Sequence, residues 1–400
     1  MLMSKCISVQ TFAFFIAGVL LFFLSTLMLS CVRSETSSLS ADPGTYLQAG
    51  ERSTIQTVVG TAAHPNIYLN AVEIEDIRAR VDAGEEPWQS AYEQMMAAAN
   101  EALGHEPYSI TSNGGPEEGH AYETQRPYCG WTAVDGEKPD CRDGQINPQA
   151  DRQDYEGAIA LGKDVSTLGL AYALTQESQY AEKILSFIRT WCLDPQTRMT
   201  PKYTNQSSKI ELSITIPGLF YGADLAYNYA AWPEQEKAGF ENWVREMTES
   251  ALGWDRKNNF ENWRVNFIAA AGALLKEESF LNYAFGRYKE LIPLQINRRG
   301  QLVEELDRTT SLSYALYALN AMTQTAEVAR HQGLNLYDYV SDQDIGLKLV
   351  ADYHAEFAAS RDAEGWPKEQ ISPLKANDNV AIYEMLHHRW PEPPYMKVID

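Results

Sequence analysis

Two short segments in the second half of the chain carry side chains suited to chemistry beside a carboxylate. Residues 257–263 include two adjacent amides, Asn258 and Asn259. The other segment supplies the guanidinium of Arg308 and, six residues later, the phenol of Tyr314. Amide and guanidinium donors stabilise the dianion that forms when a proton leaves the carbon next to an ionised acid, and a tyrosine can take that proton and return one to a leaving oxygen. The set predicts β-elimination on a uronic acid polymer.

The asparagines recur at helical spacing. Asn259, Asn262 and Asn266 are three and four residues apart, which places their amides on one helix face beside an apolar face. Because asparagine is a poor helix former, the stripe needs an explanation. In one explanation Asn258 or Asn259 caps the helix and the other amides are solvated. In the other, Asn259 donates a hydrogen bond to a substrate carboxylate.

Tyr314 and Arg308 also have two explanations each. Tyr314 shares a helix face with Ala318 and Ala321, which leaves room for a ligand over the phenol, but it could equally be an ordinary half-buried tyrosine. Arg308, near the start of that helix, either clamps a carboxylate with two parallel bonds or forms a surface ion pair of little energetic value. The nearby acids of residues 304–307 are possible ion-pair partners. They also raise a rival mechanism, glycoside hydrolysis by paired carboxylates, but nothing in the sequence sets two of them at the required separation.

The elements that hold these residues are predicted to be helices. From Glu73 onward apolar residues recur every three to four positions, and the breaks fall at glycine and proline. Residues 213–217 are locally strand-like but short. Helices joined by modest loops indicate antiparallel hairpins, arranged as a solenoid or as a closed α/α toroid, and the periodicity does not choose between them.

Residues 106–154 form a different kind of segment, rich in Gly, Pro, Asp and aromatic residues. A loop of this length inside a compact domain is usually functional or disordered. Cys129 and Cys141 flank its centre, and in an oxidising compartment they are a plausible disulfide. Cys192 lies on an apolar helix face. We expect this loop to be a lid or a cleft wall.

The N-terminal residues are predicted to lie outside the fold. Lys5 precedes an apolar run over residues 12–29, and Cys31 follows a serine, so residues 1–31 read as a signal peptide with a lipobox-like end. A transmembrane anchor is the alternative. Residues 32–60 are rich in Ser, Thr and Gly and form a flexible tether. We therefore expect a cell-envelope protein, either an outer-membrane lipoprotein or periplasmic or secreted, that meets the membrane only through its N-terminal lipid anchor.

Composition limits the partners. A formal net charge of −21 argues against nucleic acid as a partner. A polyanionic substrate is compatible with this charge only if a local basic cleft exists, because field focusing depends on local charge. The histidines are scattered and none pairs with a cysteine at ligand spacing, so neither a metal nor another cofactor is expected.

Several segments, in their order along the chain, resemble the alginate lyase family of helical toroid enzymes. Asn258-Asn259-Phe260 stands where that family usually has Asn-Asn-His. The other matching segments are Arg-Asp-Gly-Gln-Ile-Asn-Pro at 142–148, Leu-Ala-Tyr-Ala-Leu-Thr at 170–175, Tyr-Ala-Glu-Lys at 180–183, residues 191–201, and Glu-Leu-Asp-Arg-Thr-Thr-Ser-Leu-Ser-Tyr at 305–314. The resemblance implies an all-α fold, an incomplete α/α toroid over residues 61–400.

By this resemblance Asn259 and Arg308 neutralise the uronate carboxylate, and Tyr314 acts as base, acid or both. Further residues expected to bind the anionic polysaccharide are Asn258, Gln206, Arg142 and Trp263.

Phe260 departs from the family pattern, because a phenylalanine transfers no proton. His331 or His120 could replace the missing histidine. In β-D-mannuronate and D-glucuronate the C5 proton and the C4 oxygen lie on one side of the ring, so a single tyrosine can serve both steps. We therefore expect a lyase for mannuronate-rich alginate. The alternatives are a lyase for another uronate polymer, such as glucuronan, and a surface glycan-binding lipoprotein without catalysis.

Overall fold

The computed structural model describes residues 62–113, 119–129, 140–374 and 379–399. The expected signal peptide and tether lie outside these residues. Within the described residues the regular structure is helical, and β-pairing is limited to isolated bridges such as Tyr128 with Ile146 and Thr310 with Gln370.

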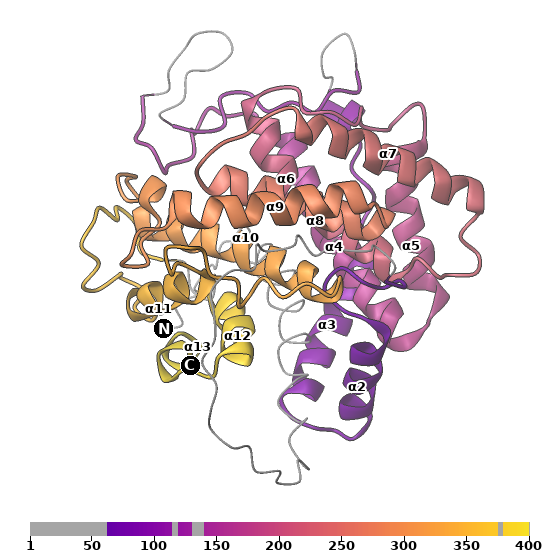
Figure 1. The fold of residues 1–400 in the computed structure, drawn as a ribbon. Coiled ribbons are helices and arrows are strands. Elements are labelled where there is room, and N and C mark those ends of the chain that lie inside the picture. Colours follow the sequence, from indigo (N-terminus) through magenta and orange to yellow (C-terminus); the bar gives the residue numbers. More distant parts are fainter. Residues whose placement is uncertain (1–61, 114–118, 130–139, 375–378, 400) are drawn as a thin grey trace, which may run out of the picture.

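Four long helices form an inner layer in which each packs against the next along the chain (Figure 1). They are α4 (Gln153–Thr175), α6 (Gln206–Leu225), α8 (Asn259–Leu275) and α10 (Ser311–His331). Outer helices alternate with them in sequence and pack against their outer faces. These are α5 (Ser178–Ile188), continued by a π-helical turn η3 (Arg189–Leu193), then α7 (Glu234–Leu252), α9 (Glu278–Gln295) and α11 (Leu347–Ala358). This alternation of inner and outer helices is that of an incomplete α/α toroid, so the predicted fold is confirmed.

Shorter helices complete the two ends of the described chain. At the amino end they are α2 (Ala71–Asp82), α3 (Trp88–Leu103) and the 3₁₀ turn η2 (Ile110–Asn113). A second 3₁₀ turn, η4 (Val303–Glu305), precedes α10, and α12 (Val380–Arg389) and α13 (Pro393–Ile399) follow α11. Among the described residues, no helix is both long enough and apolar enough to cross a bilayer.

Burial separates the inner helices from the outer ones. In α8 the residues from Asn259 to Leu274 are all buried, as expected for a helix enclosed on every side. The outer helix α7 instead buries a single stripe. Its members are Phe240, Trp243, Val244, Met247, Thr248 and Ala251. Polar residues in the inner layer must therefore find partners inside the protein or face the open end of the toroid.

Glycines let α4 and α6 approach closely. A Cβ atom built on Gly218 would lie 2.5 Å from the carbonyl oxygen of Gly162, and one built on Gly222 would collide with the backbone of Val165. Side chains are excluded at these crossing points, so the two backbones touch. This contact fixes the carboxyl-terminal half of α6 against α4.

The strand-like residues 213–217 are helical and lie inside α6. Asn205 caps this helix with a capping box: its side chain accepts a hydrogen bond from the backbone N–H of Ser208, and the Ser208 hydroxyl accepts one from the backbone N–H of Asn205. Isoleucine and threonine are frequent here because the helix is buried between α4 and α8. Packing in the inner layer therefore overrides local β-propensity.

Candidate active site

The start of α8 is held by a buried carboxylate. Asn258 is the N-cap residue, but its side chain makes no capping hydrogen bond. Asn259 follows, and both its backbone N–H and its side-chain Nδ2 donate to Oε1 of Glu305, at 2.7 and 2.8 Å. Only 1% of Asn259 is exposed. An amide nitrogen carries two hydrogens, so Glu305 orients the Asn259 amide and leaves its second N–H for another acceptor.

The asparagine stripe is buried and partnered rather than solvated. Asn262 and Gln295 exchange hydrogen bonds of 2.9 and 3.1 Å, and Gln295 also donates to the carbonyl oxygen of Lys257 at 2.8 Å. Asn266 donates to Gln324 on α10 at 3.2 Å. The stripe therefore joins α8 to its neighbours, and Gln295 fixes the backbone just before Asn258.

Several buried polar atoms around the start of α8 have no hydrogen-bonding partner within the described residues. They are Oδ1 of Asn258, Oε2 of Glu305, and the indole nitrogens of Trp254 and Trp263. Buried polar groups are normally satisfied, so such atoms call for an explanation. Two indole donors and two oxygen acceptors at one helix end are suited to the hydroxyl groups of a sugar.

Arg308 joins this helix end to Tyr314. Its Nε and Nη2 donate to the two carboxylate oxygens of Asp143, at 2.8 and 2.9 Å, and its Nη1 lies 3.5 Å from Oε2 of Glu305. The guanidinium carbon lies 3.7 Å from the centre of the Tyr314 ring. The fork predicted to clamp a substrate thus binds Asp143 in this structure, and Nη1 is the donor left beside Glu305.

The charges of this group shift one another's pKa values. Burial raises the pKa of Tyr314, against the opposing effect of the Arg308 guanidinium. Burial would also raise the pKa of Asp143, but the hydrogen bonds and the charge of Arg308 outweigh it and hold that pKa below its usual value. Burial raises the pKa of Glu305, although hydrogen bonds from Asn259 oppose the rise. A cation so placed stabilises the phenolate of Tyr314.

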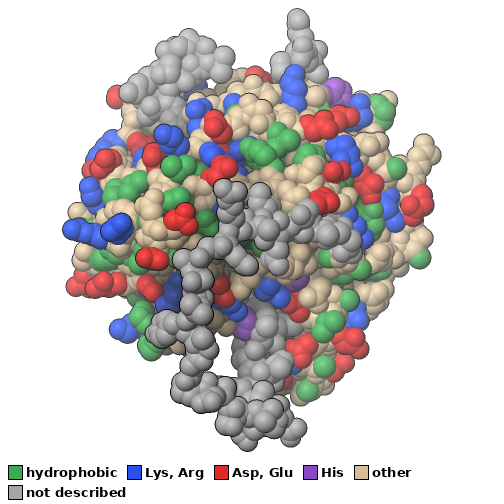
Figure 2. Space-filling view, viewed as in Figure 1, with side chains coloured by type: hydrophobic (Ala, Val, Ile, Leu, Met, Phe, Trp, Pro, Cys, Tyr) green, Lys and Arg blue, Asp and Glu red, His purple; other side chains and the backbone are tan. Residues whose placement is uncertain are grey.

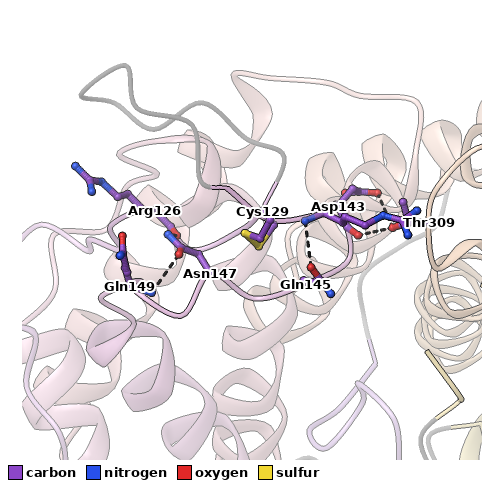
Figure 3. The surroundings of a disulfide bond; sticks show 9 residues. Arg126, Cys129, Asp143, Gln145, Asn147, Gln149 and Thr309 are labelled. Carbon is purple, nitrogen blue, oxygen red and sulfur yellow. Dashed lines mark hydrogen bonds between the residues drawn. A yellow bond between two sulfur atoms is a disulfide. The ribbon is translucent and has the colours of Figure 1, made fainter. Parts of the chain in front are cut away.

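Asp143 comes from the loop that the sequence predicted to be a cleft wall, and a disulfide anchors it (Figure 3). Cys129 and Cys141 are bonded, as predicted, while Cys192 is free and buried. The hydroxyl of Thr309 donates to the backbone carbonyl of Asp143. The loop is therefore attached to the segment that carries Arg308 at both the backbone and the side chain of Asp143.

The other residues predicted to bind the substrate differ in how far they are exposed to solvent. Trp263 is 5% exposed and packs on Tyr317, with ring centres 4.9 Å apart. Arg142 is exposed and pairs with Glu369 at 2.5 Å. Gln206 is the first residue of α6 and is exposed. The structure thus groups Asn258, Asn259, Arg308 and Tyr314 closely, while Arg142 and Gln206 lie on exposed segments.

Sequence reasoning missed Lys209. Its ammonium lies 5.2 Å from the centre of the Trp254 ring, and it makes no ion pair with the described residues. Burial, and then the charge of Arg256, lowers its pKa. The available signal was its spacing, because Lys209 follows Gln206 by three residues and so shares its helix face. A lysine here adds positive charge next to the start of α8.

Phe260 belongs to a small apolar cluster, apart from the main core. It is 9% exposed and clusters with Ile210, Trp263 and Ala321. The two histidines proposed to replace its missing function have hydrogen-bonding partners of their own. His331 bonds to Glu73 at 2.8 Å, seventeen residues and about 26 Å along α10 from Tyr314. Nδ1 of His120 pairs with the carbonyl oxygen of Arg198 at 2.7 Å.

The surface charge is mixed rather than uniformly acidic. Figure 2 shows Lys and Arg interspersed with Asp and Glu over the viewed face. Among the described residues, no group of three or more His, Cys, Asp or Glu side chains is arranged to hold a metal ion. Of the cations named above, Lys209 makes no ion pair with the described residues, whereas Arg308 is paired with Asp143.

The sequence of this region matches a known family. A family model described as alginate lyase matches residues 110–366, which include the loop, the inner helices and Tyr314. The chain belongs to the alginate lyase family. It is a polysaccharide lyase, and the glycoside hydrolase alternative is set aside. No curated protein matches the chain.

Solved structures of alginate lyases share the fold. One from Bacteroides ovatus is 23% identical, with a TM-score of 0.71 over 84% of this chain and 95% of that one. Alginate lyase A1-III from Sphingomonas species A1 is 18% identical, with a TM-score of 0.60 over 88% of this chain and 95% of that one. A variant of alginate lyase A1-III complexed with a tetrasaccharide, 18% identical, has a TM-score of 0.59 over 83% and 90% of the two chains.

Proposed function

We propose that this member of the alginate lyase family cleaves a polyuronate, mannuronate-rich alginate in the first place, by β-elimination. The observation that carries the proposal is the stacking of Arg308 on Tyr314 at 3.7 Å, beside the amides that begin α8. A phenol, a guanidinium and amide donors at one place are the groups that proton abstraction beside a carboxylate requires.

The reaction begins with neutralisation of the uronate carboxylate. The second amide hydrogen of Asn259 and Nη1 of Arg308 donate to it, and Lys209 adds positive charge. The phenolate of Tyr314 then takes the C5 proton, and the electron pair of that bond moves into the carboxylate as a dianion. Formation of the C4–C5 double bond expels the C4 oxygen, which receives the proton from Tyr314. The products are an unsaturated sugar end and a new reducing end.

The side chain at position 260 narrows the range of possible substrates. Phe260 transfers no proton, so Tyr314 must both remove the C5 proton and protonate the C4 oxygen. This is possible where the two lie on the same side of the ring, as in mannuronate and glucuronate. Guluronate, where they lie on opposite faces, requires a second group. Glucuronan is therefore the second candidate substrate, on the same stereochemical ground.

The decisive experiment is digestion of purified polymannuronate, polyguluronate and glucuronan, followed by the ultraviolet absorbance of unsaturated ends. We expect absorbance to rise fastest with polymannuronate and least with polyguluronate. A protein that binds these polymers without any rise in absorbance would instead be the glycan-binding protein that Phe260 also suggests, and the lyase proposal would fail.

Variants assign the roles. Tyr314→Phe should abolish turnover and leave polymer binding nearly intact, since only proton transfer is lost. Arg308→Ala should weaken binding and rate together, because it acts on the carboxylate in the ground and transition states. Tyr229→Phe, which removes a surface hydroxyl bonded to Glu182, is the matched control. Normal turnover by Tyr314→Phe would remove this tyrosine from the mechanism.

A further inference from the structure

The segment just before α8 is fixed at its backbone and carries two cations without a partner. The buried carboxylate of Glu261 accepts a hydrogen bond from the backbone N–H of Arg256 at 2.9 Å, and Arg287 donates to the Arg256 carbonyl oxygen at 3.2 Å. Gln295 donates to the next carbonyl oxygen, that of Lys257, at 2.8 Å. The side chains of Arg256 and Lys257 are exposed, and neither forms an ion pair with the described residues. Both cations are therefore available to a ligand.

Lys209 brings a third cation to the same place. From the first turn of α6 its ammonium lies 5.2 Å from the centre of the Trp254 ring. Burial lowers the pKa of Lys209, and the nearby charge of Arg256 lowers it further. The acid of this segment, Asp255, is exposed and pairs with neither cation within the described part of the chain. Two like charges this near repel each other, so an anion bound by both would be stabilised.

Trp254 connects these cations to the reaction site. Its ring packs against the small apolar cluster that contains Phe260. Lys209 immediately precedes Ile210, another member of that cluster. Arg256 stands three residues before Asn259, the first residue of α8. Both cations therefore lie beside the amide that is proposed to bind the reacting unit.

A polyuronate carries one carboxylate on every sugar unit. The carboxylate of the reacting unit is assigned to Asn259 and Arg308, and two nitrogens of Arg308 are already bound to Asp143. The carboxylate of the next unit therefore needs a cation of its own near the reaction site. Guanidinium and ammonium groups both donate to carboxylates, and hydrogen bonds between charged partners are stronger than those between neutral ones. Charge complementarity thus favours a uronate over a neutral sugar at Lys209 and Arg256.

We propose that Lys209 and Arg256 together bind the carboxylate of the uronate unit next to the one that is cleaved. The inference rests on the proposed lyase function and adds to it a second carboxylate-binding subsite. Such a subsite selects polymers with acids on consecutive units, and it disfavours polymers in which uronates alternate with neutral sugars.

Kinetics separate this subsite from the reaction centre. A contact with a unit that does not react is made equally in the ground state and the transition state. Lys209→Met and Arg256→Gln should therefore each raise the KM for polymannuronate by about 10-fold and change kcat by less than about twofold. A fall in kcat with an unchanged KM would assign these cations to the reacting carboxylate and overturn the proposal.

Lys183→Met is the matched control. Lys183 also lies over an aromatic ring, 5.6 Å from the centre of Phe187, and it forms no ion pair with the described residues. It stands on the outer helix α5. This variant removes the same charge from the molecule and should leave KM within about twofold of the wild type. An equal rise of KM in Lys183→Met and Lys209→Met would show an effect of total charge and refute the subsite.

A change in the polymer identifies the group that is bound. Polymannuronate in which some carboxyl groups have been reduced to alcohols still offers reacting uronates, but many of them have a neutral neighbour. The ratio of KM between Lys209→Met and the wild type should therefore fall toward one on this polymer. A ratio equal to that on intact polymannuronate would mean that Lys209 does not bind the neighbouring carboxylate.

Failure of the lyase proposal itself would be recognised separately. The wild-type protein would then release no unsaturated ends from any polyuronate. Calorimetric titration with intact polymannuronate would still compare Lys209→Met with Lys183→Met. Weaker binding by Lys209→Met alone would support the carboxylate subsite, and equal binding by the two variants would refute it.

Discussion

Asp143 determines how much of the positive charge of Arg308 acts on the Tyr314 phenol. Burial is the main cause of the raised pKa of Tyr314, and the charge of Arg308 opposes it. Asp143 binds two nitrogens of that guanidinium, and its own negative charge adds to the rise. Since the base is the phenolate, the rate should rise with pH as Tyr314 loses its proton.

Asp143→Asn should therefore shift this rise to lower pH. Removing the negative charge leaves Arg308 to stabilise the phenolate, so the pKa of Tyr314 falls. The measurement is kcat/KM against pH. Asp307→Asn is the control, because Asp307 is exposed and, among the described residues, forms an ion pair with Lys368 alone. A shift to higher pH in Asp143→Asn would contradict the assignment of Tyr314 as base.

Phe260 leads to a second prediction at this scale. Phe260→His places a titratable ring beside Asn259, and a histidine can act as a second acid or base near neutral pH. Activity on polyguluronate should then rise relative to polymannuronate. Phe260→Leu controls for altered packing and should not change the ratio. A wild-type enzyme that prefers polyguluronate would refute the single-tyrosine argument.

The sequence identified chemistry-bearing residues better than their partners. Asn259, Arg308 and Tyr314 could be proposed because amide, guanidinium and phenol occur in two short segments. The pairing of Arg308 with Asp143 spans 165 positions, and spacing along a helix reveals only neighbours three or four residues apart. Glu305, expected as a partner of Arg308, does lie 3.5 Å from its Nη1, but the hydrogen bonds that Glu305 accepts come from Asn259, which the sequence did not indicate.

At the scale of elements, helix spacing predicted the helices but not the layer to which each belongs. The solenoid and the toroid share the same periodicity, and only the close approach of inner helices distinguishes them. Residues 213–217 show the same limit, because β-branched residues suit both a strand and a helix buried on all sides. In α4 and α6 the glycines at the crossing points were the missed signal.

Gly222→Ala tests this approach. The added methyl group would meet the backbone of Val165, so we expect a loss of about 1–3 kcal/mol in the free energy of unfolding. Gly286→Ala on α9 is the matched control. A Cβ there meets no atom within 4 Å, so alanine should stabilise the helix by about 0.5–1 kcal/mol. Denaturant titration of both variants checks the difference, and equal effects would refute the packing argument.

At the scale of the whole molecule, we propose that the enzyme is attached to the cell envelope through Cys31. This residue lies outside the described structure, and the proposal rests on the apolar run and the Ser-Cys step after it. Cys31→Ala should move the protein from the membrane fraction to the soluble fraction, with Cys6→Ala as control. Retention of Cys31→Ala in the membrane would indicate that residues 12–29 anchor the chain instead.

One buried and one half-buried acid make the stability of the whole fold depend on pH. Burial raises the pKa values of Glu211 and Glu384 to about 7, from 4.5 in a model peptide. Between these values the folded protein holds more protons than the unfolded chain, so its free energy of unfolding decreases as the pH rises toward 7. Two other groups have the opposite effect, because they lower the free energy of unfolding as the pH falls. Burial lowers the pKa of His354 to about 4. The pKa of Glu73 is about 2, because contacts with His331 and Arg330 outweigh burial.

The raised pKa values of Glu211 and Glu384 predict lower stability at pH 8 than at pH 6. Glu211 and Glu384 are mostly protonated in the fold at pH 6 and ionised at pH 8, whereas Glu73 is ionised at both. Glu384→Gln should reduce the decrease measured by denaturant unfolding at the two pH values, because the amide carries no charge to bury. Glu356→Gln, at an exposed position of α11, should leave the decrease unchanged. If Glu384→Gln and the wild type lost equal stability between pH 6 and pH 8, the ionisation of Glu384 would not be a source of the pH dependence.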